Sequence, residues 1–171
     1  VKRQLGAYRE EAVHSQLNLL GSHDTPRVRT SLGGDMAALK QAWLLLFAFP
    51  GAPCVYYGDE IGLQGGHDPH CRAGMPWEQR EDWDEELLQL VKSLTHARRE
   101  HAALTHGATH VSAPKYDLVL IERRTQEPSS AVYVLVNTSG AASTVPESAM
   151  PRGRYRDLLT GSVVELVNGD G

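Results

Sequence analysis

The feature that most constrains this chain is a repeated unit in its N-terminal third: a short apolar strand ends at a glycine, and polar residues follow. The first strand is predicted over 16–20 and ends at Gly21, and the second is predicted over 53–57 and ends at Gly58. The second run does not alternate apolar with polar residues, which is typical of a parallel strand covered on both faces. The order strand, loop, helix, strand, loop predicts an α/β fold whose chemistry lies at the carboxyl ends of the strands.

Two longer helices are predicted, and residues 2–13 are expected to be a helix tail and a connector. The helix over 36–49 follows Asp35, which can cap it, and its last two turns are apolar all round, so it should be buried on most sides. The second helix follows a capping-box pattern over 82–85, with Asp82 in the cap position, and extends to about residue 101. Its apolar stripe contains Leu87, Val91 and Leu94.

His23 and Asp24 follow the first strand side by side. They are either reactive groups at the open end of a barrel or sheet, or solvated side chains of an ordinary polar loop. The residue types alone leave both interpretations open. Ser22 completes the residue types of a hydrolase triad, but adjacent residues at a strand end cannot easily form the required line, and no Gly-x-Ser-x-Gly elbow occurs. After the second strand, the neighbouring acids Asp59 and Glu60 are expected mainly to fix loops.

A long irregular loop is predicted over 62–80, and its length favours an ordered, functional segment. His67, Asp68, His70 and Cys71 have the residue types of metal ligands. Their spacing fits no closed zinc site, and the flanking glycines and proline predict a turn. No metal is therefore expected, and Cys71 is interpreted as a free thiol.

Beyond residue 107 the pattern changes, and we place a domain boundary near 103–107. Short β-type runs are predicted at 119–121, 131–136, 155, 158–159 and 163–167, and turn signals lie at 127–130, 137–140, 151–153 and 160–161. Closely spaced strands with turn signals predict an antiparallel sheet or sandwich.

Composition excludes several classes of protein. The net charge is −4 with both signs interspersed, so no nucleic acid and no membrane surface is expected as a partner. The longest apolar run, 42–49, is too short to cross a bilayer. Two cysteines make no disulfide framework, which fits a reducing, cytoplasmic compartment. No cofactor is expected.

Three ordered motifs together resemble the C-terminal part of an α-amylase-family glycoside hydrolase (family 13). Residues 19–24 (LLGSHD) are similar to that family's last signature motif, at the end of its seventh barrel strand. Residues 56–62 (YYGDEIG) are similar to its eighth strand and the loop entry. Residues 65–72 (GGHDPHCR), with Met-Pro-Trp at 75–77, most resemble the cyclomaltodextrinase, neopullulanase and maltogenic amylase branch.

The resemblance implies a fold and a division of the chain. Residues 1–104 would form the last two βα units of a (β/α)₈ TIM barrel, and residues 105–171 an antiparallel β C-terminal domain that stops early. The chain also lacks a starting Met, so we interpret it as a processed or excised piece. Because a quarter-barrel exposes strand edges, the isolated chain is expected to dimerise, rearrange or aggregate. A homodimer of the whole protein is also left open.

The resemblance also implies roles for single residues. The family is retaining, with a carboxylate nucleophile and a carboxylic acid across the scissile bond. Asp24 matches the family's third carboxylate, a transition-state stabiliser, and His23 matches a histidine that donates to the same sugar. Asp68 and Arg72 match positions that hold a neighbouring glucose unit. The substrate would be an α-glucan oligosaccharide with α-1,4-glucosidic bonds, such as a cyclomaltodextrin, pullulan or a maltooligosaccharide.

This sequence carries neither the nucleophile motif nor the acid motif, so the chain alone is expected to be inactive. The competing hypothesis is a non-catalytic module that binds glucan or a protein through its β-rich tail. Such a surface usually offers exposed aromatic side chains, and beyond residue 107 the chain has only Tyr116, Tyr133 and Tyr155. That number is too small to favour a binding module.

Overall fold

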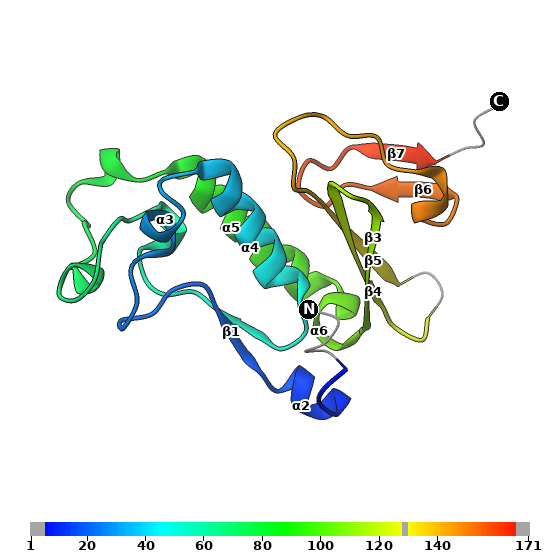
Figure 1. Ribbon diagram of the computed structural model, residues 1–171, viewed down its shortest axis with the longest axis horizontal. Helices are drawn as coiled ribbons and strands as arrows, with labels where there is room; N and C mark the ends of the chain where they lie inside the picture. Colours follow the sequence, from blue (N-terminus) through cyan, green and yellow to red (C-terminus); the bar gives the residue numbers. More distant parts are fainter. Residues whose placement is uncertain (1–5, 128–129, 167–171) are drawn as a thin grey trace.

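The computed structural model describes residues 6–127 and 130–166. Helices packed beside two parallel strands form the N-terminal part, and antiparallel strands form the C-terminal part (Figure 1). The helices are α2 (Glu10–His14), α3 (Val28–Ser31), α4 (Met36–Ala48), α5 (Glu85–Glu100) and α6 (Ala102–His106). The strands are β1 (Leu17–Leu19), β2 (Ala52–Cys54), β3 (Ala108–Lys115), β4 (Leu118–Arg124), β5 (Ala131–Asn137), β6 (Gly153–Arg156) and β7 (Val163–Leu166). An α/β fold with antiparallel sheets is confirmed.

Strands β1 and β2 pair in parallel, as predicted, with Leu17 opposite Ala52 and Leu19 opposite Cys54. The second strand is shorter than predicted and ends at Cys54. Tyr56 and Tyr57 lie outside the ladder because the backbone turns there, and both aromatic rings face a buried guanidinium, described below.

Helices α4 and α5 form the core with each other. Asp35 caps α4, as predicted, since its Oδ1 accepts a hydrogen bond from Ala38 N at 3.0 Å. The buried cluster includes Leu39, Trp43, Leu46 and Phe47 of α4 and Leu87, Val91 and Leu94 of α5. Burying side chains of this size contributes roughly 1.5–3 kcal/mol each, so this contact fixes the scaffold on which the loops are carried.

The capping-box prediction was wrong about its residue. Asp84 caps α5, and its Oδ1 accepts from Leu87 N at 2.9 Å. Asp82 instead lies in the 3₁₀ turn Arg80–Asp82. This turn ends just before Trp83, so the chain becomes helical only after Asp84.

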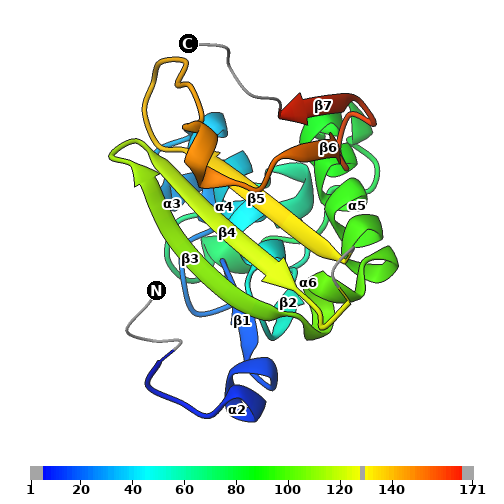
Figure 2. The same cartoon turned by 90° about the vertical axis from the view of Figure 1, so that its right-hand side faces the viewer.

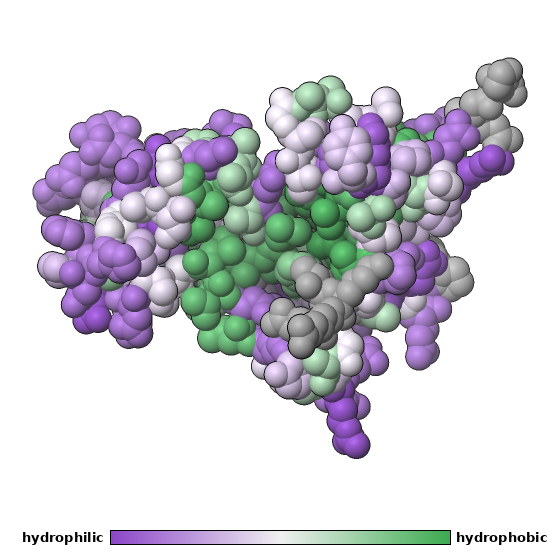
Figure 3. All heavy atoms as spheres, viewed as in Figure 1, coloured by the Kyte–Doolittle hydropathy of each residue, from purple (hydrophilic) through white to green (hydrophobic). Residues whose placement is uncertain are grey.

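Strand β1 is covered on one face only. The sequence predicted coverage on both faces for the second strand, and in β2 Ala52 is exposed while Pro53 and Cys54 are partly buried. Leu20 packs against the α4–α5 core, whereas Leu17 is 63% exposed and Leu19 is 48% exposed. Successive side chains of a strand point to opposite faces, so Leu17 and Leu19 mark the bare side. In Figure 3 the apolar surface gathers over the region of α4 and β1.

The C-terminal part contains a three-stranded antiparallel sheet in the order β3-β4-β5 and a β6–β7 hairpin. Figure 2 shows this sheet facing the viewer, with α4 and α6 behind it. Buried Arg123 joins the two parts, because it donates to Ala48 O at 2.7 Å and to Gly107 O at 3.0 Å.

Several expectations about smaller elements need correction. Residues 158–159 form a turn, not a strand, because Asp157 Oδ1 accepts from Leu159 N at 2.8 Å. The sequence did not predict α3, α6 or β3. The interval 103–107, where a domain boundary is expected, overlaps α6 and Gly107. Residues 2–5 of the predicted helix tail lie outside the described residues. Positions 128–129 of the predicted turn 127–130 and residue 167 of the predicted run 163–167 also lie outside them. No helix within the described ranges is long and apolar enough to cross a bilayer.

Candidate functional site

The four residues singled out from the sequence lie in one cluster, although they come from two loops. His23 and Asp24 follow β1, and Asp68 and Arg72 lie in the long loop after β2. Arg72 is the centre: its Nε lies 3.1 Å from Asp68 Oδ1 and its Nη2 lies 3.4 Å from Asp24 Oδ1. His23 Nε2 lies 3.2 Å from the other oxygen of Asp24, Oδ2.

This cluster is open to solvent. The side chain of Arg72 is 49% exposed and that of Asp24 is 69% exposed. Exposed ion pairs contribute little to stability, typically below about 1 kcal/mol. The cluster is therefore poorly suited to holding the fold together. It presents two carboxylates, an imidazole and a guanidinium, and a polar ligand could replace their exposed ion pairs at a low cost in folding free energy.

The turn that carries Asp24 is held by its own hydrogen bonds. Ser22 N donates to Thr25 Oγ1 at 3.1 Å, and Asp24 N donates to Ser22 Oγ at 3.2 Å. The Ser22 hydroxyl is thus engaged with Thr25 and the Asp24 backbone and does not reach His23. A Ser–His–Asp line is absent at this turn, in agreement with the sequence argument, although His23 and Asp24 do touch each other.

The long loop is fastened to this turn from the other side. Cys71 Sγ donates to His23 O at 3.2 Å, and Arg72 Nε donates to the same carbonyl at 3.0 Å. Tyr56 and Tyr57 donate through their hydroxyls to Cys71 O and Ala73 O, at 3.3 Å and 2.8 Å. Cys71 is buried and its thiol is free. Within the described ranges no three His, Cys, Asp or Glu side chains form a group suited to a metal ion.

Of the neighbouring acids after β2, Asp59 is buried beneath the site. It is 1% exposed, and Arg27 Nη1 donates to its Oδ1 at 3.2 Å. Burial raises the pKa of Asp59 to about 6, although the Arg27 hydrogen bond and charge act in the opposite direction. Glu60 is half-buried. No role for Arg27 was predicted from the sequence.

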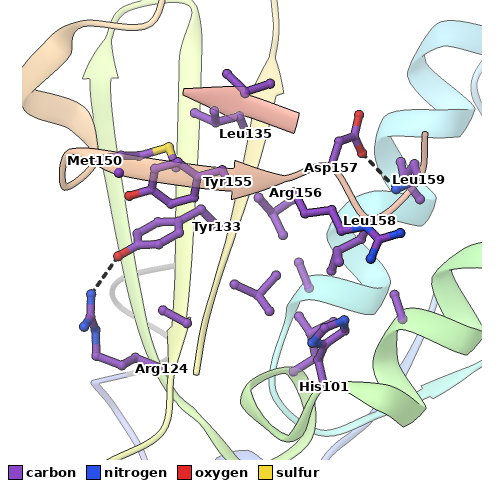
Figure 4. Close-up of a pocket in the computed structure, with 18 of the residues that line it drawn as sticks. His101, Arg124, Tyr133, Leu135, Met150, Tyr155, Arg156, Asp157, Leu158 and Leu159 are labelled. Atoms are coloured by element: carbon purple, nitrogen blue, oxygen red, sulfur yellow. Dashed lines mark hydrogen bonds between the residues drawn. The ribbon is translucent and has the colours of Figure 1, made fainter. Parts of the chain in front are cut away.

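A separate groove of about 910 Å³ lies between the β6–β7 hairpin, β5 and the helices. Figure 4 shows its mainly apolar lining, with Leu135 and Met150 among the labelled residues. Tyr133 and Tyr155 are both part of this lining and pack edge to face on each other, with ring centroids 5.6 Å apart. None of the four clustered residues lines this groove, so it is distinct from the candidate site.

Known proteins that are similar to this chain belong to one family. The family model described as the catalytic domain of alpha amylase matches residues 1–84. A cyclomaltodextrinase of Geobacillus thermopakistaniensis is 37% identical over 158 residues, covering 92% of this chain and 27% of the relative. Neopullulanase 2 of Thermoactinomyces vulgaris is 37% identical over 168 residues, covering 95% and 28%.

This chain is also similar to solved structures of related enzymes. The debranching enzyme of Nostoc punctiforme superposes with a TM-score of 0.76 at 37% identity, over 83% of this chain and 28% of that one. The chain thus spans about a quarter of the length of the curated relatives it matches.

Proposed function

Because this chain belongs to the α-amylase family of glycoside hydrolases, we propose that it is the C-terminal part of a retaining enzyme that cleaves α-1,4-glucosidic bonds. The substrates would be cyclomaltodextrins, pullulan or maltooligosaccharides. Relatives named cyclomaltodextrinase, maltogenic α-amylase and neopullulanase support this substrate class.

The bare face of β1 and β2 supports a barrel. In a (β/α)₈ barrel, helices cover the outside of the strands, and side chains from other strands fill the inside. Leu17 and Leu19 are apolar and exposed on the side away from the helices, as the inner face of two strands would be without the other six. Residues 1–104 are accordingly proposed as the end of the barrel and residues 105–171 as a C-terminal β domain.

The observation that carries the proposal is the convergence of His23, Asp24, Asp68 and Arg72 on one another. They come from the carboxyl ends of two adjacent parallel strands, which is where barrel enzymes place their chemistry. The members of the cluster are exposed, so packing in the core does not explain why they lie together.

Each residue has a role that fits its chemistry. Asp24 would accept hydrogen bonds from the hydroxyls of the sugar that reacts, and these bonds strengthen as that ring gains positive charge in the oxocarbenium-like transition state. His23 would donate to the same sugar. Asp68 and Arg72 would hold the neighbouring glucose unit, with Arg72 also fixing the carboxylate of Asp24.

The test compares two variants in the complete polypeptide. Asp24→Asn keeps the shape of the side chain but removes its charge, and we expect kcat on maltoheptaose to fall by about 100-fold or more. Asp82→Asn is the matched control, because Asp82 is an exposed carboxylate outside the cluster, and it should leave kcat unchanged. Near-normal turnover by the Asp24→Asn protein would refute the role of Asp24.

The 171-residue chain alone should not hydrolyse maltoheptaose, because the nucleophile and the acid belong to strands whose motifs it does not carry. Measurable turnover by this chain would contradict that expectation. A non-catalytic glucan-binding role gains no support from the β-rich tail, where Tyr133 and Tyr155 pack on each other and Tyr133 Oη accepts from Arg124 at 2.6 Å. We further propose a cytoplasmic enzyme, in keeping with a relative named intracellular maltogenic amylase, and leave open a homodimer of the whole protein.

A further inference from the structure

The turn that carries His23 and Asp24 rests at both of its ends on one buried carboxylate. Gly21 precedes the turn, and a Cβ at this position would lie 2.3 Å from Asp59 Oδ2, so the backbone passes directly over that oxygen. Arg27 follows the turn, and its Nη1 donates to the other oxygen, Oδ1, at 3.2 Å. A movement of Asp59 would therefore displace the chain on both sides of Asp24.

Arg27 cannot easily leave this position. Its side chain is 0% exposed, its guanidinium lies 4.3 Å from the ring centroid of Tyr56 and 4.6 Å from that of Tyr57, and its Nη1 donates to Tyr57 O. Its backbone N also donates to Gly65 O at 2.9 Å. A buried guanidinium that loses its hydrogen-bond acceptor leaves a buried donor unsatisfied, which is unfavourable.

These contacts connect every segment that bears a site residue. Arg27 belongs to the segment after β1, Asp59 and the two tyrosines follow β2, and Gly65 begins the loop that contains Asp68 and Arg72. The pair thus sets the position of one loop relative to the other. The hydrogen bonds and the ion pair of Arg27 and Asp59 do not involve the exposed cluster directly.

We propose that Arg27 and Asp59 are positioning residues for Asp24, holding the turn over 22–26 against the long loop so that Asp24 meets Arg72. The catalytic consequence of this positioning rests on the proposed function. The positioning itself does not, because it concerns only where the turn lies.

The first test uses the 171-residue chain and reads the backbone amide chemical shifts by NMR. Asp59→Leu removes the acceptor at similar size, and we expect large shift changes at residues 22–26. Asp59→Asn retains an oxygen that can accept from Arg27, and it should restore most of the wild-type shifts. Arg123→Met is the matched control, since it removes a buried arginine elsewhere and should leave residues 22–26 in place.

Two outcomes of this test would overturn the proposal. One is an unchanged turn in Asp59→Leu, and the other is an equal disturbance of the turn by Arg123→Met. If Asp59→Leu does not fold, Arg27→Lys makes the same test, because the shorter lysine side chain has no planar guanidinium to stack on Tyr56 and Tyr57 while donating to Asp59. An undisturbed turn in Arg27→Lys would likewise overturn it.

The second test measures hydrolysis of maltoheptaose by the complete polypeptide. Misplacement by about 1 Å can reduce the rate about 100-fold, so Asp59→Leu should lower kcat by that order while changing KM little, and Asp59→Asn should recover most of it. A KM effect with normal kcat would refute positioning of Asp24. If the wild-type polypeptide hydrolyses no glucan, the proposed function fails, and the NMR result still decides the positioning.

Discussion

Arg72 and Asp24 are 48 positions apart in the sequence, yet Arg72 Nη2 lies 3.4 Å from Asp24 Oδ1. The same guanidinium reaches Asp68 Oδ1 through Nε at 3.1 Å. Its Nε hydrogen is donated to His23 O, so the contact with Asp68 is an ion pair and the contact with Asp24 is a hydrogen bond from Nη2. Arg72 is therefore the side chain that makes one site out of two loops.

Replacing Arg72 with lysine in the complete polypeptide should weaken action on maltoheptaose. A single ammonium cannot hold both carboxylates in the same geometry, and losing a hydrogen bond to a charged group costs roughly 1.5–3 kcal/mol. We expect kcat/KM to fall by about 10- to 100-fold in steady-state assays. Arg80→Lys is the control, because Arg80 lies on the same loop but stacks on Trp83. Equal losses in both variants would contradict a specific role for Arg72.

The two aspartates before α5 should differ in their effect on stability. Asp84 Oδ1 accepts from Leu87 N at 2.9 Å, and loss of such a cap typically costs about 1 kcal/mol. Asp84→Ala should therefore lower the free energy of unfolding in urea by this amount. Asp82→Ala should change it by less than about 0.5 kcal/mol, since Asp82 caps nothing in α5. The reverse order would restore the capping box that the sequence predicted.

The bare face of β1 gives a test of the proposed barrel. Leu39 is 0% exposed in the core, and Leu39→Ala should cost roughly 2–5 kcal/mol of unfolding free energy in the 171-residue chain. Leu19 is exposed there, so Leu19→Ala should cost less than about 1 kcal/mol. In the complete polypeptide, where other strands would cover it, Leu19→Ala should cost as much as Leu39→Ala. A small effect of Leu19→Ala in both proteins would argue against the barrel.

The residues of the cluster came from the family resemblance, whereas local sequence patterns predicted the parallel strands and the cap of α4. Such patterns were not sufficient where distant contacts decide. The strand β3, Ala108–Lys115, has few apolar residues, and it forms because β4 offers it an antiparallel partner. The cap of α5 is Asp84 and not the predicted Asp82, because the preceding 3₁₀ turn fixes where the helix can begin.

The role of Arg27 could not be predicted for the same reason. Its burial depends on two tyrosines and an aspartate about thirty positions further on, and a single arginine in a turn carries no local sign of them. Gly21 was interpreted as the end of a strand. Its closeness to Asp59 Oδ2 appears only when both loops are placed together.

Asp59 should make stability depend on pH in a direction opposite to most carboxylates. Burial raises its pKa from the ordinary 3.8 to about 6, against the opposing effect of Arg27 and with a further increase from Glu60. The folded protein therefore binds this proton more tightly than the unfolded chain does. The resulting contribution to stability is fully present below about pH 3.8 and is lost as the pH rises through about 6.

Urea unfolding of wild type and Asp59→Asn at several values between pH 4 and pH 7 isolates this contribution, because the other carboxylates are common to both proteins. The difference in unfolding free energy, wild type minus variant, should fall across this range by an amount on the order of 3 kcal/mol, which is the free energy of a pKa shift of about two. A constant difference would mean that Asp59 titrates alike in both states. A rising difference would mean that the Arg27 hydrogen bond outweighs burial and holds Asp59 ionised.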